Sequence, residues 1–454
     1  MSPEGFNVFW ANRLVAIFAI ITALWLIFSG LGSHALWDDE AMDALNAESI
    51  IANGDTVGWV GSNLVAYRNG LLLVDGRQQG MPPLPGYLAA SSIRLFGTSS
   101  LTARAPFAAC GVVTVVVIML FASSLGCSWI ELLVTAIAIL GNVSFLLFFR
   151  NCHYYGPGIL FTTICLITYF RGLHSRLSQF IIGLFSALLL FTNYTWFVAL
   201  YICLIIDIVI SKQGYFLKSF ASLFRILILP FIAGLVIIWK WNPLGTKLGS
   251  YLHGSTVVQK VELFFWNWRD MNVCEYISYG ILFIALVLAV FHGNVILRRL
   301  LIALTVYVLV ITALSTQLLE SASLADIRYM AGALPICIAI TAVILVMAVR
   351  KQQLMGVALT IIACGTSLLN GGTLRFLPVE YISEILLQTE DPYKPAAKWI
   401  REHVRDGDSV WVLPDYMVYP LMYHAPGMKI KRLGGIGQQL LIRRPLEEPD
   451  NADD

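Results

Sequence analysis

Three consecutive acids, Asp38, Asp39 and Glu40, follow the first long apolar run of the chain. A carboxylate beside a membrane is costly unless it faces water at the bilayer surface or works inside a polar cavity. Next to a substrate, such a group can take a proton from an attacking hydroxyl or amine. The alternative is structural, because acids are also favoured in the first turn of a helix. The pattern favours a catalytic acidic turn, with helix capping as the competing interpretation.

Basic and aromatic residues that could complete a site lie at the ends of other apolar runs. Arginine holds an anionic phosphate through parallel hydrogen bonds and stays charged. An acid with several arginines therefore suits transfer from a phosphate-linked donor whose lipid tail lies among the helices. A single Arg at a helix end can instead be an anchor whose charge reaches the membrane surface. The residues concerned are Arg104, Arg150, His153, Tyr154, Tyr155, Asp326, Arg328 and Tyr329.

The chain is too apolar for a soluble protein. Of its 454 residues, 58% are hydrophobic and 13% are charged, against roughly 25% charged in soluble domains. This composition predicts an all-α polytopic membrane protein embedded in a lipid bilayer. The net charge of +2 gives no support for a nucleic-acid partner. The eight cysteines form no CxxC pair, so neither a zinc site nor a disulfide framework is indicated.

Eleven apolar runs are long enough, with flanking residues, to be membrane-spanning helices of about 20 residues. A further run, 84–96, begins after Pro82-Pro83 and is shorter, so we expect a partial or re-entrant helix. The architecture predicted is a bundle of about 11–13 helices. The eleven runs are 11–32, 105–122, 129–149, 157–170, 179–192, 195–210, 222–240, 276–292, 299–316, 330–349 and 353–370.

Lys and Arg positions predict which loops share a side of the membrane. With a cytoplasmic N-terminus and no crossing by 84–96, all four basic loops fall on the cytoplasmic side, whereas a crossing would break the rule four times. These loops are 171–176, 212–225, 298–299 and 350–351. The outer loops are then 33–104, 150–156, 241–275 and 317–329, with the chain after 370. All the candidate site residues share that outer side, which is the strongest reason to group them.

The first outer loop, 33–83, is expected to carry surface helices. Apolar residues recur with helical spacing from Asp39 to Ala52, which predicts an amphipathic helix on the membrane surface. Residues 69–76 are typical of a short extended stretch between turns. The loop 241–275 is rich in tryptophan. It fits either an interfacial aromatic belt or a lid over a binding cavity.

The composition divides the chain into a transmembrane domain, 1–377, and a small soluble α/β domain on the outer side, 378–454. The second part is small for independent stability, so we expect it to pack on the membrane part. Its acidic end, 447–454, is predicted to be a disordered tail. The elements expected before the tail are a helix over 393–405, a strand over 409–413 and a second helix over 416–424.

Several short motifs carry a resemblance to a known group of enzymes. They are Asp39-Glu40-Ala41, Pro82-Pro83-Leu84, Leu95-Phe96-Gly97, Ala103-Arg104-Ala105-Pro106-Phe107 and Asp326-Ile327-Arg328-Tyr329 with Pro335. In this order and spacing they resemble the lipid-phosphate-sugar-dependent glycosyltransferases of the GT-C fold, the group of protein O-mannosyltransferases and lipid A aminoarabinose transferases (families 39 and 83). No single motif is specific, and the resemblance covers roughly residues 11–430.

The resemblance implies an integral membrane glycosyltransferase that moves a hexosyl or pentosyl group from a polyprenyl-phosphate donor, with inversion. The acceptor would be a glycan, lipid or protein on the periplasmic or exterior face of a bacterial inner or plasma membrane. Asp39 would be the base or position the acceptor, with Asp38 on the acceptor side and Glu40 in support. The donor phosphate and sugar would be bound by Arg104, Arg150, Arg328, Tyr154 and Tyr155, together with His153 and Tyr329.

Two departures from the group's pattern stand out. Many relatives place Lys or His directly before the Pro-Pro-Leu motif, where this chain has Met81, with Arg77 as a substitute. Some relatives carry an Asp shortly after the arginine that corresponds to Arg150, and this chain has none there. Asp43 or Glu48 would replace it only if the first outer helix folds back. No cofactor is therefore indicated with certainty, and a divalent metal stays an open alternative.

Two other classes of function compete with transfer. A transporter or flippase should place charges near the middle of its spans and often shows internal repeats, whereas this chain has almost no mid-span charge and no repeat. A non-catalytic scaffold subunit of the same fold is the other alternative. The missing basic residue before Pro82 keeps it open.

Overall fold

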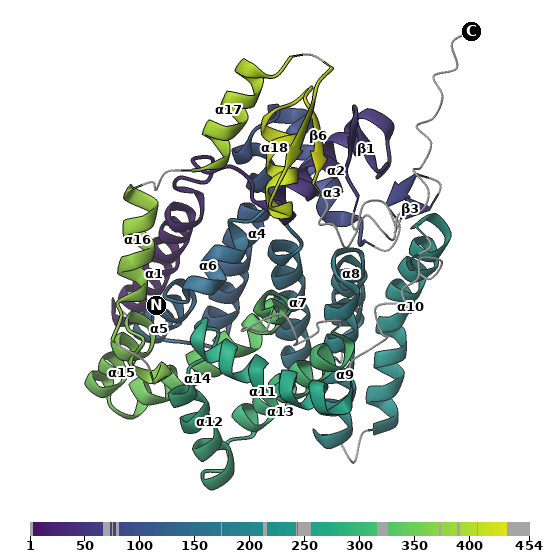
Figure 1. The fold of residues 1–454 in the computed structure, drawn as a ribbon. Helices are drawn as coiled ribbons and strands as arrows, with labels where there is room; N and C mark the ends of the chain where they lie inside the picture. The colour runs from purple at the N-terminus through teal and green to yellow at the C-terminus, as the bar shows by residue number, and fades with distance from the viewer. Residues whose placement is uncertain are drawn as a thin grey trace.

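The structure is a computed structural model that describes residues 3–433 apart from 67–72, 75, 79–80, 174, 212–215, 242, 244–255, 316–325, 372–373, 388–390 and 406. It is predominantly helical, with short strands gathered at one end (Figure 1). The expected acidic tail and most of the expected extended stretch at 69–76 lie outside the described residues.

The apolar runs form a bundle of packed helices, and each of the eleven predicted runs coincides with one helix or a helix pair. By length and composition, five helical segments within the described residues could cross a membrane, or six if α5 and α6, bent by 64°, are one broken span. The bundle helices are α1 (Pro3–Phe28), α4 (Ser100–Ser124), α5 (Trp129–Leu140), α6 (Val143–Phe149), α7 (Tyr155–Arg171), α8 (Arg176–Thr192), α9 (Tyr194–Ser211), α10 (Phe216–Trp241), α12 (Tyr279–Phe291), α13 (Val295–Leu314), α14 (Leu334–Lys351) and α15 (Gln353–Gly365). The 3-10 helix η4 (Ile327–Ala333) leads into α14.

Polar caps fix where bundle helices begin. Ser99 accepts the N–H of Thr102 at 3.1 Å before α4. Glu131 accepts the N–H of Ser128 at 2.9 Å before α5, so a capping box starts that helix. Asn142 accepts the N–H of Phe145 at 2.8 Å and restarts the chain as α6 after the break. Each cap satisfies a backbone N–H group that a helix start leaves without an intrahelical partner.

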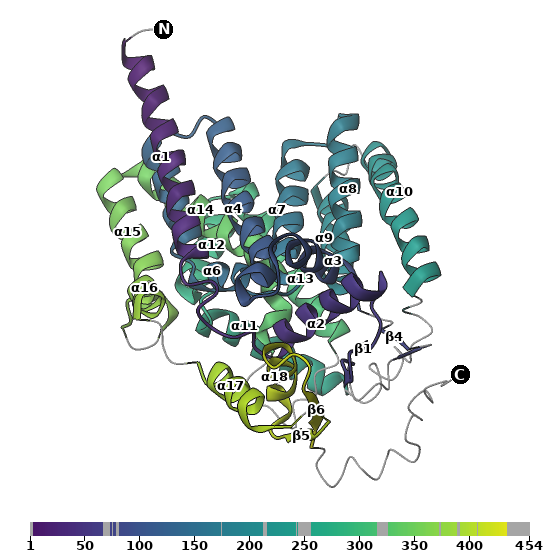
Figure 2. The ribbon, with the colours of Figure 1, turned by 90° about the horizontal axis from the view of Figure 1, so that it is seen from above.

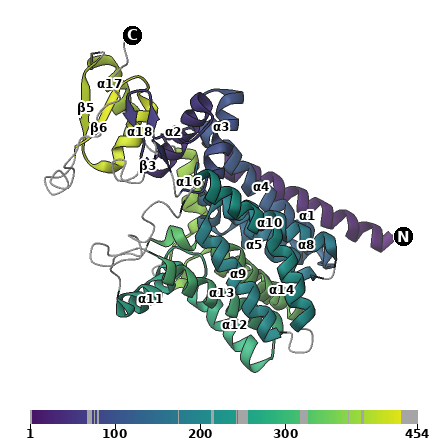
Figure 3. The same cartoon turned by 90° about the vertical axis from the view of Figure 1, so that its right-hand side faces the viewer.

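The elements outside the bundle gather at one end. In Figures 2 and 3 the N-terminus of α1 lies at one end of the bundle, and α2 (Asp38–Asn53), α11 (Val257–Val273), α17 (Tyr393–His403) and α18 (Val418–His424) lie toward the other. This agrees with the expectation that 33–83, 241–275 and the C-terminal part share a side. The predicted partial helix is present as α3 (Leu84–Phe96), which packs on α2 and α4.

The helix predicted after the acidic turn is present, but other elements cover it. Most of α2 is buried, including Glu40, Asp43 and Ser49, and α3 and α18 pack against it. Its small residues Ala41 and Ala44 are fully buried, so neighbouring elements approach α2 closely. The expectation of a helix lying on the membrane surface therefore gives way to one enclosed between the bundle and the C-terminal part.

The strands are short and pair locally. β1 (Trp59–Val60) pairs with β2 (Asn63–Leu64), and β3 (Leu73–Val74) with β4 (Arg77–Gln78), both antiparallel. In the C-terminal part, β5 (Ser409–Val412) and β6 (Lys429–Arg432) are parallel, with Ser409 opposite Lys429, and α18 connects them. α16 (Leu377–Leu387) and α17 precede β5.

An apolar core joins the C-terminal part to the first outer loop. It contains Leu45 of α2, Ile93 of α3, Phe107 of α4, Tyr419 of α18 and Ile430 of β6. The Tyr419 hydroxyl also donates to the carbonyl of Ala66 at 2.9 Å. The C-terminal part therefore packs on the outer loop through a shared core, as its small size leads us to expect.

Candidate active site around Asp39 and Arg328

The link between α1 and α2, residues 29–37, positions the acidic turn and is tied to α6. Arg150 follows α6, and its Nη1 donates to the carbonyls of Leu26, Ile27 and Ser29 at 3.1, 3.0 and 2.7 Å. The carbonyl groups at a helix end have no partner within the helix, so this guanidinium caps the end of α1. Arg150 therefore stabilises the start of the link between α1 and α2.

The C-terminal part holds the same link from the other side. Lys394 donates to the carbonyls of Gly32 and Ser33, and Asp391 accepts the N–H of Ala35. His424 Nε2 accepts the N–H of Leu36 at 3.0 Å. Burial lowers the pKa of His424 to about 4, so the ring is neutral near pH 7 and has a lone pair for this bond.

Glu40, the third acid of the turn, forms a buried ion pair with Arg104. Arg104 Nε and Nη2 donate to the two Glu40 carboxylate oxygens at 2.8 and 2.6 Å. The other three N–H groups of Arg104 reach the carbonyls of Leu31, His34 and Ala35 at 2.9, 3.0 and 2.8 Å. A guanidinium has five N–H donors, and all five are used. Arg104 therefore fixes the link, with no donor left for a phosphate.

Asp39 lies on the open side of the turn and contacts Arg328 from η4. Arg328 Nη1 donates to Asp39 Oδ2 at 2.5 Å, while its Nε and Nη2 donate to Asp326 at 2.7 and 2.8 Å. The guanidinium also lies 5.1 Å from the ring centroid of Trp37. Within the described residues these bonds use three of its five N–H donors, which leaves two for an anionic ligand. Side-chain exposure is 24% for Asp39 and 37% for Arg328, so both can meet a ligand.

Asp38 faces the C-terminal part. Burial and the neighbouring Asp39 charge raise the pKa of its carboxyl to about 6. Arg432 of β6 and Asp415 are close enough for their charges to act on it, and these two lie 3.6 Å apart. The Oδ1 atom of Asp38 is enclosed and has no hydrogen-bond partner among the residues described. Neighbouring acids of one turn thus face different parts of the molecule.

The turn between α6 and α7 is docked on α2 and carries the predicted aromatic residues. The Cys152 N–H donates to Glu40 at 2.6 Å, and His153 Nδ1 lies 2.6 Å from Asp43 Oδ2. The ring centroid of His153 lies 4.2 Å from that of Tyr154 and 4.7 Å from that of Tyr155. Tyr155 is near enough to Arg328 and Asp39 for their charges to act on it. The aromatic residues of this turn, of which Tyr155 is affected by both charges, therefore lie near the Asp39–Arg328 pair.

The structure brings some predicted residues together and separates others. Asp39 contacts Arg328, and Tyr155 lies near enough for their charges to act on it. Tyr329 follows in η4, and its carbonyl accepts from the Trp196 indole at 2.9 Å. Arg104 and Arg150 hold the α1–α2 link instead. Arg77 lies on β4, exposed, with Nη1 3.6 Å from Asp55. Among the described residues, Arg328 is the arginine that contacts Asp39, and the binding of a ligand by Arg104 or Arg150 stays a prediction.

Sequence reasoning gave little weight to two neighbours of the site. Asp43 pairs with His153, and its signal was its spacing four residues after Asp39, which places both on one face of a helix. Trp37 lies under the Arg328 guanidinium, and nothing beyond adjacency to the acidic turn indicates this role. Asp43 thus supplies a second acid near the site, paired with a histidine.

Three acids of the site each have a basic partner. Asp39 is bonded to Arg328, Glu40 to Arg104 and Asp43 to His153. Among the residues described, no group of three His, Cys, Asp or Glu side chains is arranged to hold a metal ion.

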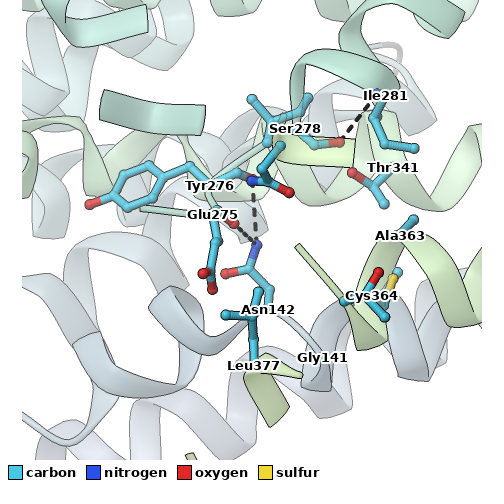
Figure 4. Close-up of a pocket in the computed structure, with 14 residues that line it drawn as sticks. Gly141, Asn142, Glu275, Tyr276, Ser278, Ile281, Thr341, Ala363, Cys364 and Leu377 are labelled. Atoms are coloured by element: carbon cyan, nitrogen blue, oxygen red, sulfur yellow. Dashed lines mark hydrogen bonds between the residues drawn. The ribbon is translucent and has the colours of Figure 1, made fainter. Parts of the chain in front are cut away.

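A separate pocket lies at the α5–α6 break, and Figure 4 shows its lining. Asn142 spans it by donating to the carbonyls of Glu275 and Tyr276 at 3.0 and 3.4 Å. Its volume of about 40 Å³ suits a few water molecules at most. None of the predicted site residues lines this pocket, which belongs to the packing of a broken helix.

Comparison with solved structures identifies the fold. ArnT from Cupriavidus metallidurans bound to undecaprenyl phosphate matches with a TM-score of 0.62 over 94% of this chain and 87% of that one, at 11% identity. Its apo state gives 0.61 at 12% identity, over 94% and 86%. The apo oligosaccharyltransferase from Archaeoglobus fulgidus gives 0.53 at 13% identity, over 95% of this chain and 65% of that one.

These similarities establish that the chain has the GT-C glycosyltransferase fold. The archaeal oligosaccharyltransferase AglB from Archaeoglobus fulgidus, in complex with an inhibitory peptide and a dolichol-phosphate, gives 0.51 at 13% identity, over 94% of this chain and 64% of that one. No protein-family profile and no curated protein sequence matches the chain. The resemblance seen in the short motifs is therefore confirmed at the level of the fold.

Proposed function

We propose that this chain, which has the GT-C fold, is an integral membrane glycosyltransferase that moves a sugar from a polyprenyl-phosphate donor to an outer-side acceptor. The observation that carries the proposal is the Asp39–Arg328 pair. It joins a partly exposed carboxylate to a guanidinium that has two N–H donors not used by the described residues. Matching structures hold undecaprenyl phosphate and dolichol-phosphate, which supports a lipid-phosphate donor for this chain as well.

In the proposed reaction the acceptor attacks the anomeric carbon from the face opposite the phosphate. A bond forms between that carbon and the acceptor oxygen or nitrogen, and the carbon–oxygen bond to the phosphate breaks, so configuration is inverted. Asp39 takes the acceptor proton. Arg328 stabilises the negative charge that develops on the departing polyprenyl phosphate through a charge-assisted bond.

The two faces of the acidic turn suggest where each substrate lies. Tyr154 and Tyr155 lie on the bundle side, near enough to Arg328 for its charge to act on them, which suits the donor head group, with the prenyl tail among the helices. Asp38 faces Arg432 and Asp415 of the C-terminal part, which suits hydrogen bonding to an acceptor. We assign this side of the protein to the periplasm or cell exterior, following the distribution of Lys and Arg.

The test is transfer from a radiolabelled polyprenyl-phosphate sugar by purified protein in nanodiscs, with membrane extracts as the acceptor source. Asp39→Asn keeps the size of the side chain and one oxygen that can accept from Arg328 but removes the base, and we expect transfer to fall by about 10²–10⁴-fold. Asp55→Asn is the matched control, because Asp55 pairs with Arg77 elsewhere in the same outer loop. Transfer by Asp39→Asn at the control rate would contradict the assignment of Asp39.

A further inference from the structure

A cavity separate from the Asp39–Arg328 pair lies between the α1–α2 link, the end of α6 and α16. Neither Asp39 nor Arg328 lines it. Its volume is about 150 Å³, and at about 10–15 Å³ for each water molecule it has room for on the order of ten waters. The polar side chains of its lining are those of Ser33, His34, Arg150, Asn151, Tyr381 and Glu384. The proposed transfer step uses none of them.

Arg150 has hydrogen-bond donors left for a ligand in this cavity. Its Nη1 serves the three carbonyls at the end of α1, and Tyr381 is close enough to the guanidinium to interact with it. A guanidinium has five N–H donors, so at least two remain within the part of the chain that the structure describes. The Nη2 atom lies beside Gly30 of the cavity lining, where a Cβ atom would be 3.9 Å from it.

Glu384 of α16 brings the opposite charge to the same cavity. Arg150 and Glu384 are both near enough to Tyr381 for their charges to act on it. Among the residues described, however, neither of the two belongs to a salt bridge. Charges at the edge of a protein interior are normally paired. Two opposite charges that line one cavity without pairing therefore match a ligand that carries both signs.

The elements around the cavity place it at the edge of the bundle, on the outer side. In Figure 1, α16 lies at this edge between α15 and α17, and the Tyr381 hydroxyl joins it to α1 by donating to the carbonyl of Leu26 at 2.9 Å. Leu386 and Leu387 of α16 are exposed, as is Trp25 in the last turn of α1. Tryptophan is enriched where lipid meets water. A membrane lipid can therefore reach the cavity with its polar head.

We propose that this cavity binds the phosphoethanolamine head group of a membrane phospholipid. Arg150 holds the phosphate through charge-assisted hydrogen bonds, and Glu384 accepts a hydrogen bond from the ammonium group. The acyl chains lie along α1 and α16. This lipid is neither the donor nor the acceptor of the sugar. It contacts the link that carries Asp39 and stabilises it.

The first experiment compares two phospholipids, one with an ammonium group in its head and one without. Delipidated protein in detergent is titrated with phosphatidylethanolamine or with phosphatidylglycerol of the same chain length, and native mass spectrometry counts the bound lipid. We expect one phosphatidylethanolamine per protein, bound at least about tenfold more tightly than phosphatidylglycerol, because a hydrogen bond to a charged group contributes that much. Equal affinity for the two lipids would overturn the proposal.

The second experiment removes the contact with the ammonium group. Glu384 is exposed, so Glu384→Gln should fold as the wild type does. We expect its affinity for phosphatidylethanolamine to fall about tenfold, to the level of phosphatidylglycerol. Glu402→Gln is the matched control, because Glu402 of α17 is an exposed acid of the C-terminal part that does not line the cavity. A Glu384→Gln protein that keeps the wild-type preference would contradict the role of Glu384.

The third experiment fills the cavity without touching its charges. Leu147 of α6 lines the cavity and is exposed, so Leu147→Trp adds volume there and keeps the bonds of Arg150 to α1. We expect the affinity for both phospholipids to fall by about tenfold or more. The control is Leu120→Trp, at an exposed leucine of α4 away from the cavity. Wild-type lipid binding by folded Leu147→Trp would place the lipid elsewhere. If Leu147→Trp does not fold, Glu384→Gln alone carries the test.

Two competitors identify the source of the head group. Free phosphoethanolamine shows whether the head group alone is enough, and polyprenyl phosphate shows whether the sugar donor uses the same cavity. We expect neither to displace phosphatidylethanolamine at equal concentration. Displacement by free phosphoethanolamine would overturn a membrane lipid as the occupant. Displacement by polyprenyl phosphate would assign the cavity to the donor, and would overturn the proposal as well.

Discussion

Replacement of Arg104 should destabilise the protein rather than weaken donor binding specifically. Arg104→Met removes all five hydrogen bonds of the guanidinium and leaves Glu40, which is 0% exposed, without its partner. Removing one member of a buried ion pair costs about 3–5 kcal/mol, and the freed carbonyls of the α1–α2 link add to this. We expect a large loss of folded protein on heating, because the link that carries Asp39 loses the guanidinium that bonds three of its carbonyls.

The measurement is the temperature at which half of the detergent-solubilised protein leaves the monodisperse peak in fluorescence-detected size exclusion. The double variant Glu40→Gln/Arg104→Met is the control, since it leaves neither charge buried alone and should recover part of the lost stability. Binding of polyprenyl phosphate to the folded fraction is measured in parallel. Wild-type heat resistance in Arg104→Met together with lost lipid-phosphate binding would refute the structural role and return Arg104 to the donor site.

Two further predictions concern Arg328 and Glu48. Arg328→Lys should lower kcat by about 10²–10³-fold with little change in thermal stability. The reason is that Lys supplies one point charge in place of the fork that joins Asp39 to Asp326. Equal rates for the wild type and Arg328→Lys would count against the role of Arg328. Burial raises the pKa of Glu48 from 4.5 to about 7, so ionising it costs folding stability as the pH rises from 4.5 to 7. Glu48→Gln should therefore raise the melting temperature at pH 8 and leave it unchanged at pH 4, and a uniform shift at both pH values would show that its effect is unrelated to this ionisation.

The bundle could be predicted from the sequence because each span is a local feature. A run of apolar residues long enough to cross a membrane forms a helix wherever it lies. The short helix α3 was also predictable, because Pro82-Pro83 marks its start and Gly97 its end. β6 was not, since Lys429–Arg432 is four residues long with Ile430 as its single apolar residue, and it pairs with β5 only in the folded chain.

The candidate site could be predicted only in part, because its contacts join distant parts of the chain. The partner of Glu40 lies 64 residues away and that of Asp39 lies 289 residues away. Nothing local distinguishes Arg104, whose donors all serve the backbone and Glu40, from Arg328, which contacts Asp39. The burial of α2 likewise depends on α18, far along the chain. The acidic turn itself was predictable, because three consecutive acids after an apolar run are a local feature of the sequence.

The most direct test of the account is an experimental structure of this protein with a bound polyprenyl phosphate. We predict that the phosphate contacts Arg328 next to Asp39, on the end of the bundle where α2, α11 and α18 gather, with the prenyl chain among the bundle helices. A phosphate bound at the opposite end, beside the basic loops near the start of α1, would contradict both the assigned site and the proposed orientation.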